Sequence, residues 1–484
     1  MGSTERWGDP TTGKVSSLEE ARDREEAMKP EHQIRMLIDG QWMEGEGAAV
    51  TVVDKFTGGE LGRLCSASPA QVEAAVAAAR AAFISIRLEP YERSRLLNRV
   101  ADLILAEREA LAAMIIAESG VPWKDSANEV VRTAETFRVS AEEGRRLAGE
   151  IVPIQGASGQ SGRMAYTLRV PRGVVGGISS FNSPLNMVAH KVAPALASGN
   201  AVVFKPPVAT PLSATRLFEL MLEAGIPGGL INLIHGGGAD VGAPLAAHAG
   251  VDFFTFTGST PVGKAISASR GMRATALELG SIAATIVCAD GDLERAAVRC
   301  VERSAMDRFL PMLLEQVRAL KVGDPRDHAT DVGPMISEAE AVRAETWVRE
   351  ATDRGARVLT GGERRGAILT PTVLTDADPA SKVLCEEIFA PVLTVLPFDT
   401  LDEAIERVNA TPFGLAAGLF TRDLSRALKA AERLHVGVVH LNEASSSRVD
   451  LMPFGGVKDS GVGVEGPRYA MREMTEERLV TITL

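Results

Sequence analysis

Between residues 174 and 278 the chain alternates short apolar runs with stretches of helical periodicity, and this alternation constrains the fold more than any other feature. The apolar runs include GVVGGIS, AVVFKP, INLIHG and VDFFTFTGS, and amphipathic segments such as SATRLFELMLEAG lie between them. Alternating strands and helices are typical of a doubly wound parallel sheet. The sequence therefore predicts an α/β fold.

The rest of the chain adds further elements around this region. At 484 residues it is too long for one core and predicts two or three domains, with a second α/β region over about 280–456. A hairpin is expected at Asp39-Gly40, a helix after Ser68, and long helices up to residue 147. The tail EERLVTITL predicts a strand that joins the sheet of another element, often in a partner subunit.

Composition excludes several functional classes. The formal net charge is −11 and both signs are interspersed, which disfavours nucleic acid and anionic membranes as partners. The four cysteines are far apart and form no CxxC pair, so neither a disulfide framework nor a metal site is expected. No apolar run reaches the roughly 20 residues of a membrane span, and we expect a cytoplasmic protein.

Two glycine-rich segments match nucleotide-binding patterns imperfectly. GVGVEG, residues 461–466, fits GxGxxG but does not follow a strand, so it is not expected to bind a dinucleotide. GSTPVGKA, residues 258–265, has Ala265 where a P-loop needs Ser or Thr, which excludes an ATPase. This segment does follow an apolar strand and opens a helix, whose N-terminus offers free N–H groups to a phosphate.

Eight motifs in order carry a resemblance to a known family. They are ISSFNSPLN, AVVFKPPVATPLSA, FTFTGSTPVGKAI, LELGS, KVGDPRDHATDVGPMIS, CEEIFAPV, TPFGLAAGLFTRDLSRA and MPFGGVKDSGVGVEGPRYAMREMTE. Together they resemble the NAD(P)-dependent aldehyde dehydrogenase superfamily from about residue 36 to the C-terminus, and the ending SSSRVDLMPFGGVKDSG is similar to the bacterial branch that acts on lactaldehyde or phosphonoacetaldehyde.

The resemblance implies an architecture and a reaction. It implies two doubly wound α/β domains with a β oligomerisation arm, a homodimer or homotetramer, and oxidation of a small aldehyde to its acid with NAD or NADP. The expected division is a mostly disordered extension at 1–35, a cofactor-binding domain at 36–148 and 168–277, a catalytic domain at 278–456, and oligomerisation strands at 149–167 and 457–484.

The resemblance also assigns catalytic roles to matching positions. Asn182 in FNSPLN matches the residue whose amide stabilises an oxyanion, and Glu278 in LELGS matches the general base. Phe454 in PFGG matches an aromatic wall of the substrate tunnel. The other reading of Phe454 is an ordinary core residue.

Five further positions match cofactor contacts. Lys205 matches a ribose contact, with an exposed lysine at a strand end as the alternative reading, and Gly258 and Ser259 match the pyrophosphate site. Glu387 and Phe389 in EEIFAP match the residues beside the nicotinamide ribose and ring.

Two substitutions depart from the family pattern without removing the site. Val208 stands where NAD-preferring members carry a Glu for the adenosine ribose, so repulsion of a 2′-phosphate is absent and both NAD and NADP stay open as cofactors. Ala390 replaces the usual Gly of EEIFGP and is expected to crowd the backbone slightly.

The third departure concerns the nucleophile. After ADGDLERAAVRCV the family continues into a loop with a catalytic cysteine, whereas here ERSAMDRF follows near 301/302, so roughly twenty residues and the thiol that covalent catalysis requires are absent. Cys300, placed in the helix before that loop, is the remaining candidate. Cys288 is expected in the core, and Cys385 lies beside two glutamates that would raise its pKa.

The missing segment leaves two main functions open, and a third is a lesser activity such as ester hydrolysis by Glu278 and water without a thiol. Its loss is expected to remove a strand from the catalytic sheet and leave neighbouring strands unpaired. The chain is then either an aldehyde dehydrogenase-like oxidoreductase or an inactive pseudoenzyme that binds nucleotide and acts as a structural or regulatory subunit.

Overall fold

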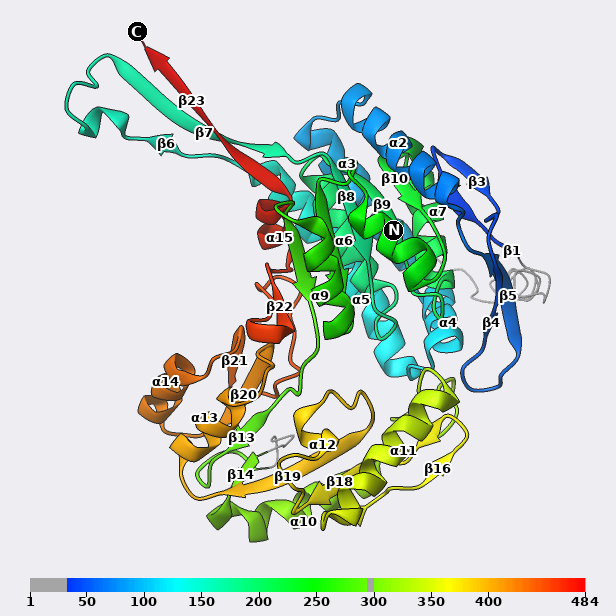
Figure 1. Ribbon diagram of the computed structural model, residues 1–484, viewed down its shortest axis with the longest axis vertical. Helices are drawn as coiled ribbons and strands as arrows, with labels where there is room; N and C mark the ends of the chain where they lie inside the picture. The colour runs from blue at the N-terminus through cyan, green and yellow to red at the C-terminus, as the bar shows by residue number, and fades with distance from the viewer. Residues whose placement is uncertain (1–32, 294–299, 484) are drawn as a thin grey trace, which may run out of the picture.

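The computed structural model describes residues 33–293 and 300–483, with the backbone alone at 300–305. Figure 1 shows two sheet-centred bodies, one above the other, and a long β-arm that projects from the upper body. Among the described helices none is long and apolar enough to cross a membrane.

The upper body is built on a sheet with the strand order β22-β12-β11-β8-β9-β10-β2-β3. Its central strands are parallel and its edge strands antiparallel. Fully buried β8 and β9 show that helices cover both faces, as parallel sheets require. The strands are β2 (Met36–Ile38), β3 (Gln41–Met43), β8 (Val174–Ile178), β9 (Ala201–Lys205), β10 (Ile231–Leu233), β11 (Phe253–Thr257), β12 (Thr275–Glu278) and β22 (Gly461–Val462).

The helices of this body confirm the predicted alternation. Ser68 caps the first of them with a reciprocal capping box to Gln71. The helices are α2 (Pro69–Ser85), α3 (Pro90–Ala106), α4 (Arg108–Ser119), α5 (Trp123–Arg146), α6 (Asn186–Ala197), α7 (Leu212–Glu223), α8 (Ala243–Ala247), α9 (Thr260–Arg270) and α15 (Pro467–Glu473).

The N-terminal part of the fold starts earlier than predicted. The hairpin at Asp39-Gly40 is present, and both turn residues have positive φ, as a type I′ turn requires. Strand β1 (Gln33–Ile34) pairs with β5 (Glu60–Cys65), which also pairs with β4 (Ala49–Val53). Because Ile34 is buried, the end of the extension at residue 35 is wrong; residues 1–32 lie outside the described residues.

The lower body is built on a second sheet with the order β15-β18-β19-β14-β13-β20-β21. Helices α13 and α14 pack on one face, and α10 packs on the other. Its strands are β13 (Thr285–Val287), β14 (Cys300–Glu302), β15 (Arg357–Thr360), β18 (Thr372–Thr375), β19 (Val392–Phe398), β20 (Ala416–Phe420) and β21 (Val438–Leu441), with a small hairpin β16 (Arg364–Arg365) and β17 (Ile368–Leu369). Its helices are α10 (Arg303–Ala319), α11 (Glu338–Asp353), α12 (Lys382–Cys385), α13 (Leu401–Asn409) and α14 (Leu424–Arg433).

The catalytic sheet keeps its strand, so the expected loss is wrong. Strand β14 lies between β13 and β19 and is parallel to both, with Cys300 opposite Ile286 and Leu396. Placing Cys300 in a helix was therefore also wrong, because backbone pairing within the sheet overrides the local helical pattern. Residues 288–299 alone join β13 to β14, close to the shortest crossover that parallel strands allow.

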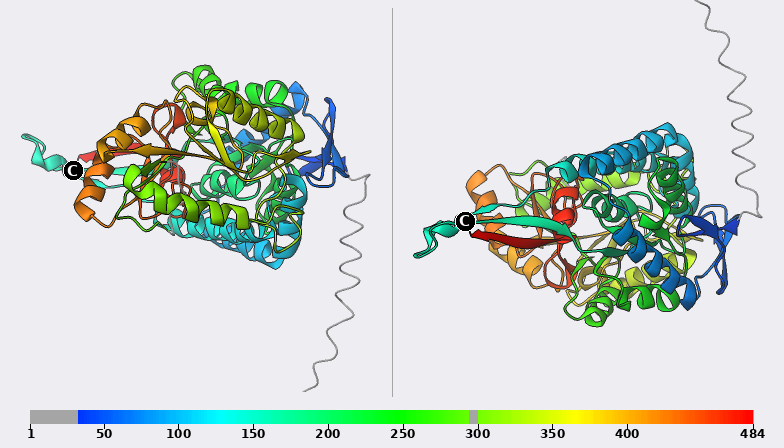
Figure 2. Two further views of the ribbon diagram at one scale, coloured as in Figure 1. Left: turned by 90° about the horizontal axis from the view of Figure 1, so that it is seen from below. Right: turned by 90° about the horizontal axis from the view of Figure 1, so that it is seen from above.

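The arm is formed by strands from the two segments that were predicted to be oligomerisation strands. Strand β23 (Thr475–Thr483) runs antiparallel to β7 (Arg163–Pro171), which also pairs with β6 (Ile151–Val152). Figures 1 and 2 show this arm extending away from both bodies, with the C-terminus at its tip. The terminal strand therefore finds its partner in its own chain, and a role in oligomerisation stays a prediction.

A buried carboxylate fixes the start of α6, the helix that leads to the candidate site. Glu129 on α5 accepts hydrogen bonds from the backbone N–H groups of Leu185 (2.8 Å) and Asn186 (3.0 Å) through one oxygen. Burial raises the pKa of Glu129 to about 7, against the effect of these hydrogen bonds. The carboxyl therefore holds its proton in the folded state at a pH where the unfolded chain has released it.

We expect Glu129→Gln to reduce the pH dependence of stability. In the wild type, the stability linked to this proton is fully present below pH 4.5 and is lost as the pH rises through about 7, at most about 3 kcal/mol. The glutamine keeps the accepting oxygen and does not titrate. Urea unfolding of both proteins at pH 5 and pH 8 measures the difference, and an equal pH dependence in the two proteins would contradict the assignment.

Candidate active site

Glu278 ends strand β12 with its carboxylate turned into the protein. One oxygen lies 3.4 Å from Nη1 of Arg448, and the other accepts a hydrogen bond of 3.2 Å from the hydroxyl of Thr257 on the neighbouring strand. The Glu278 side chain is only 11% exposed. A buried carboxylate beside one guanidinium and one hydroxyl can exchange a proton without bulk water.

Two further charged side chains complete this arrangement. Glu465 accepts from Nη2 of Arg448 (2.7 Å) and from Nζ of Lys191 (2.6 Å), and Lys191 also donates to Thr257 (2.7 Å). We call Lys191, Thr257, Glu278, Arg448 and Glu465 the carboxylate cluster. It contains two cations and two acids, all largely buried.

The pKa values of the two acids of the carboxylate cluster, Glu278 and Glu465, shift in opposite directions. Burial and the neighbouring Glu465 raise the pKa of Glu278 to about 7. Burial also opposes ionisation of Glu465, but Lys191 and Arg448 hold its pKa well below the ordinary value. When the pKa values of two neighbouring carboxyl groups differ in this way, the groups can take different catalytic roles. Glu278, with a pKa of about 7, is suited to act as a general base at neutral pH.

Arg448 lies against the residue expected to form the substrate tunnel wall. Its guanidinium carbon is 4.4 Å from the centre of the Phe454 ring, which is itself buried. The ring therefore supports the cation of the cluster through a cation–π contact. The position of Phe454 fits the core reading as well as the tunnel reading.

The segment that carries Arg448 and Phe454 is anchored by Asp450. This carboxylate accepts two hydrogen bonds from Arg132 (2.8 and 3.0 Å), one from Asn186 (3.2 Å), and pairs with Nε2 of His190 (2.8 Å). Although burial opposes it, His190 and Arg132 hold the pKa of Asp450 below its ordinary value. Asp450 thus ties the C-terminal segment to α5 and α6.

The predicted cofactor residues lie at the carboxyl edge of the same sheet. Lys205 ends β9 and donates to the carbonyls of Pro206 (3.1 Å) and Gly236 (3.3 Å); it is 5% exposed, so the reading of an exposed lysine is wrong. Burial lowers the pKa of Lys205 to about 8. Ser259 caps α9 without a side-chain hydrogen bond, which leaves its hydroxyl and the helix N-terminus to an anion.

Loops of the lower body face these residues. Glu387 accepts from the backbone N–H of Ser281 (3.1 Å), three residues beyond Glu278. Phe389 has a positive φ and stacks edge-on against Phe181, with ring centroids 5.4 Å apart. Asn182 follows Phe181, is exposed, and shares with Phe389 and Ala390 a pocket of about 430 Å³ between the two bodies.

The structure thus brings the predicted residues to one side of the first sheet. Four residues of the site carry no role in the sequence-based prediction: Lys191, Thr257, Arg448 and Glu465. A usable signal existed for Lys191, which is an isolated charge in the otherwise apolar helical segment NMVAHKVAPALA. Glu465 lies inside GVGVEG, a segment whose pattern is set by its glycines and does not mark the acid.

The described cysteines lie elsewhere. Cys288 is fully buried in the core of the second sheet, as predicted, and the thiol of Cys385 lies 3.7 Å from the carbonyl of Ala380. The side chain of Cys300 is outside the described residues. Among the described side chains no cysteine forms a hydrogen bond with the carboxylate cluster.

Comparison with known proteins decides the family. The model of the aldehyde dehydrogenase family matches residues 42–303 and 298–480 of this chain. The chain belongs to the aldehyde dehydrogenase family. The match to this family is made in two pieces that meet at residues 298–303, within and just after the short connection that leads to β14.

Relatives and solved structures of aldehyde dehydrogenases match nearly the whole chain. It is 43% identical over 471 residues to 3-sulfolactaldehyde dehydrogenase of Priestia aryabhattai, covering 93% of this chain and 98% of the relative. NADP-dependent glyceraldehyde-3-phosphate dehydrogenase from Bacillus halodurans, complexed with NADP, superimposes with a TM-score of 0.90 at 35% identity, covering 94% and 100%. The NAD⁺ complex of aldehyde dehydrogenase from Bacillus cereus gives 0.89 at 32%, covering 94% and 97%.

We expect Asp450→Ala to destabilise the protein by about 3 kcal/mol, because it leaves the Arg132 guanidinium partly buried without its carboxylate. The matched control is Asp459→Ala in the same segment, whose ion pair with Lys264 is largely exposed. Surface pairs contribute about 1 kcal/mol or less. Urea unfolding of the two variants checks this ranking, and equal losses would show that Asp450 is no anchor.

Proposed function

We propose that this chain binds NAD or NADP at the carboxyl edge of its first sheet and oxidises a small aldehyde that carries an acid group. One observation carries the proposal: the carboxylate cluster places a general base, with a pKa of about 7, at the edge where Lys205 and Ser259 lie. The pocket that holds Asn182 and Phe389 opens between the two bodies.

The residues at this edge fit a nicotinamide dinucleotide. The buried Lys205 ammonium has two carbonyl acceptors and a third N–H for a ribose hydroxyl. Gly258, Ser259 and the N-terminus of α9 suit the pyrophosphate. Glu387 and Phe389 suit the nicotinamide riboside. When bound, the nicotinamide accepts a hydride, and the two related structures were solved with NADP and with NAD⁺.

Side chains of the protein accept the proton from water and stabilise the negative charge on the aldehyde oxygen. Glu278 takes a proton from a water molecule, and the hydroxyl of Thr257 connects it to Lys191 and Glu465. Asn182 offers an amide donor to the aldehyde oxygen as its negative charge develops. Arg448 lowers the pKa of Glu278, so it keeps part of the base ionised at neutral pH.

Two arginines support an aldehyde that carries an acid group. The guanidinium of Arg448 places positive charge beside Glu278. That of Arg132 on α5 pairs with Asp450 through Nε and Nη2, is 30% exposed, and can offer Nη1 to a further anion. Arginine favours sulfonate, phosphate and carboxylate groups. The related enzymes are named for 3-sulfolactaldehyde and glyceraldehyde-3-phosphate, both of which bear such a group.

Whether the chain is an active enzyme depends on whether it has a nucleophile. Cys300 is the remaining candidate for the attacking thiol, and its backbone lies at the start of β14. Because the connection over 288–299 is short, we also propose a second function. In that function the chain binds nucleotide as a structural or regulatory subunit and does not turn over aldehyde.

A stopped-flow measurement of NADH and NADPH formation separates the two functions. If the chain is an aldehyde dehydrogenase, 3-sulfolactaldehyde or glyceraldehyde-3-phosphate gives a burst, and Cys300→Ala abolishes it. Glu278→Gln should slow turnover at least about 100-fold and leave cofactor affinity unchanged. Saturable NADP binding without any burst would instead establish the nucleotide-binding subunit.

We expect Val208→Glu to weaken NADP binding at least about tenfold relative to NAD, about 1.4 kcal/mol. Val208 is partly buried beside the apolar group of β1, β4 and β5, and a carboxylate there would repel a 2′-phosphate and accept from ribose hydroxyls. Val208→Gln is the matched control, because it adds the same length without the charge. Titration calorimetry with both nucleotides checks the change in preference, and an unchanged ratio of affinities would contradict it.

A further inference from the structure

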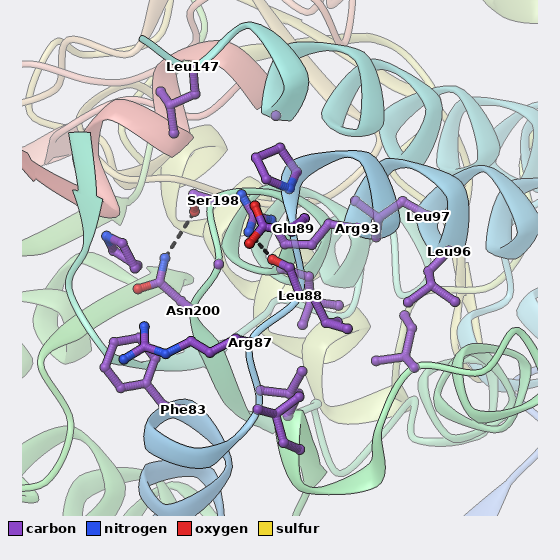
Figure 3. A pocket seen from close by; sticks show the side chains of 18 of the residues that line it. Phe83, Arg87, Leu88, Glu89, Arg93, Leu96, Leu97, Leu147, Ser198 and Asn200 are labelled. Carbon is purple, nitrogen blue, oxygen red and sulfur yellow. Dashed lines mark hydrogen bonds between the residues drawn. The ribbon is translucent and has the colours of Figure 1, made fainter. Parts of the chain in front are cut away.

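A second cavity lies at the opposite edge of the first sheet from the carboxylate cluster. Its volume is about 300 Å³, and it is lined by the end of α2, the start of α3, the end of α6 and the base of β7. Gly199 and Asn200, which directly precede β9, belong to its wall, whereas the carboxylate cluster lies where β11 and β12 end. Figure 3 shows the side chains that surround this cavity.

Three arginines from three different elements line this cavity. Arg87 precedes α3, Arg93 lies in its first turn, and Arg169 lies on β7. Glu89 is the acid among the lining residues. In a chain with a net charge of −11, this concentration of positive charge is a local exception that attracts anions.

The donors of these arginines are largely open. Arg93 donates through Nε to the carbonyl of Ala197 (2.9 Å) and through Nη1 to that of Leu88, which fixes the guanidinium in the wall. Within the described part of the chain its Nη2 has no acceptor, Arg87 forms no ion pair, and the acid nearest Arg169 is Glu477 at 3.9 Å. A rigid guanidinium with free donors is suited to a carboxylate or sulfonate.

Apart from Ser198 and Asn200, most of the remaining wall of the cavity is apolar. It is formed by side chains from α2, α3, α6 and the segment before β10, namely Phe83, Leu96, Leu97, Leu196, Ile226 and Leu230. Binding sites for small molecules combine an apolar wall with a few fixed polar groups in this way. An inorganic anion would use the arginines alone and leave this wall in contact with water.

We propose that this cavity binds a small organic anion, a carboxylate or sulfonate on a short hydrocarbon body. The anionic group pairs with Arg87, Arg93 and Arg169, and the hydrocarbon packs on the leucines of α3 and α6. The site is separate from the proposed aldehyde site and does not depend on it.

Isothermal titration calorimetry of the full chain with hexanoate tests the proposal, with acetate and hexanol as probes of each half of the ligand. Hexanoate should bind saturably, and acetate and hexanol at least about tenfold more weakly. The double variant Arg87→Gln/Arg169→Gln, which leaves the anchored Arg93 in place, should weaken hexanoate at least about tenfold. Arg349→Gln on α11 is the control for loss of an exposed arginine and should bind hexanoate as the wild type does.

The aldehyde site could also accept a carboxylate, so Arg448→Gln serves as the second control. Binding that survives Arg448→Gln and fails in the double variant supports the proposal. Binding lost in Arg448→Gln and retained in the double variant would place hexanoate at the aldehyde site and overturn it, as would equal binding of hexanol or no binding at all. Unchanged NADP affinity and unfolding midpoint in the double variant confirm that its fold is intact.

Discussion

The contact between Arg448 and the two acids Glu278 and Glu465 is the interaction on which the candidate site depends. Each of these groups costs several kcal/mol to remove from water, and the cost is offset only where opposite charges and hydrogen bonds surround it. Lys191 and Thr257 supply further hydrogen bonds to these groups, and the Phe454 ring packs against the guanidinium of Arg448. Loss of any one cation would leave a buried acid without compensation, so the geometry of the base is tightly held.

The second sheet keeps a continuous strand order around a short connection between β13 and β14. Strand β14 keeps the place between β13 and β19, and α10 follows it and covers one face. Only the connection over residues 288–299 is short. In a parallel sheet the strands carry the hydrogen-bonded ladder, so a reduced crossover removes little of the core. Loops and crossovers often carry reacting groups, so the length of this connection bears on the proposed chemistry rather than on the sheet.

Much of the fold could be predicted from the sequence. The alternation over 174–278, the Asp39-Gly40 turn and the Ser68 cap are local signals, and the structure contains each of them. The carboxylate cluster could not be found in this way, because Lys191, Glu278 and Glu465 are far apart in the chain and meet only through the sheet. Strand β14 was missed since its three residues, Cys300–Glu302, stand between charged neighbours and show no period of their own. The assigned roles of Asn182, Lys205 and Phe389 rest on resemblance and stay predictions.

We infer that the carboxylate cluster holds Glu278 as a base that titrates near neutrality. Carbon-13 NMR of the full chain labelled at the glutamate side-chain carboxyl carbon tests this directly, with the Glu278→Gln variant assigning the resonance. We expect a Glu278 signal that titrates with a midpoint near pH 7, and we expect this midpoint to move upward in Arg448→Gln, because the arginine favours the ionised form. A Glu278 signal that stays ionised down to pH 5, or that does not respond to Arg448→Gln, would contradict it.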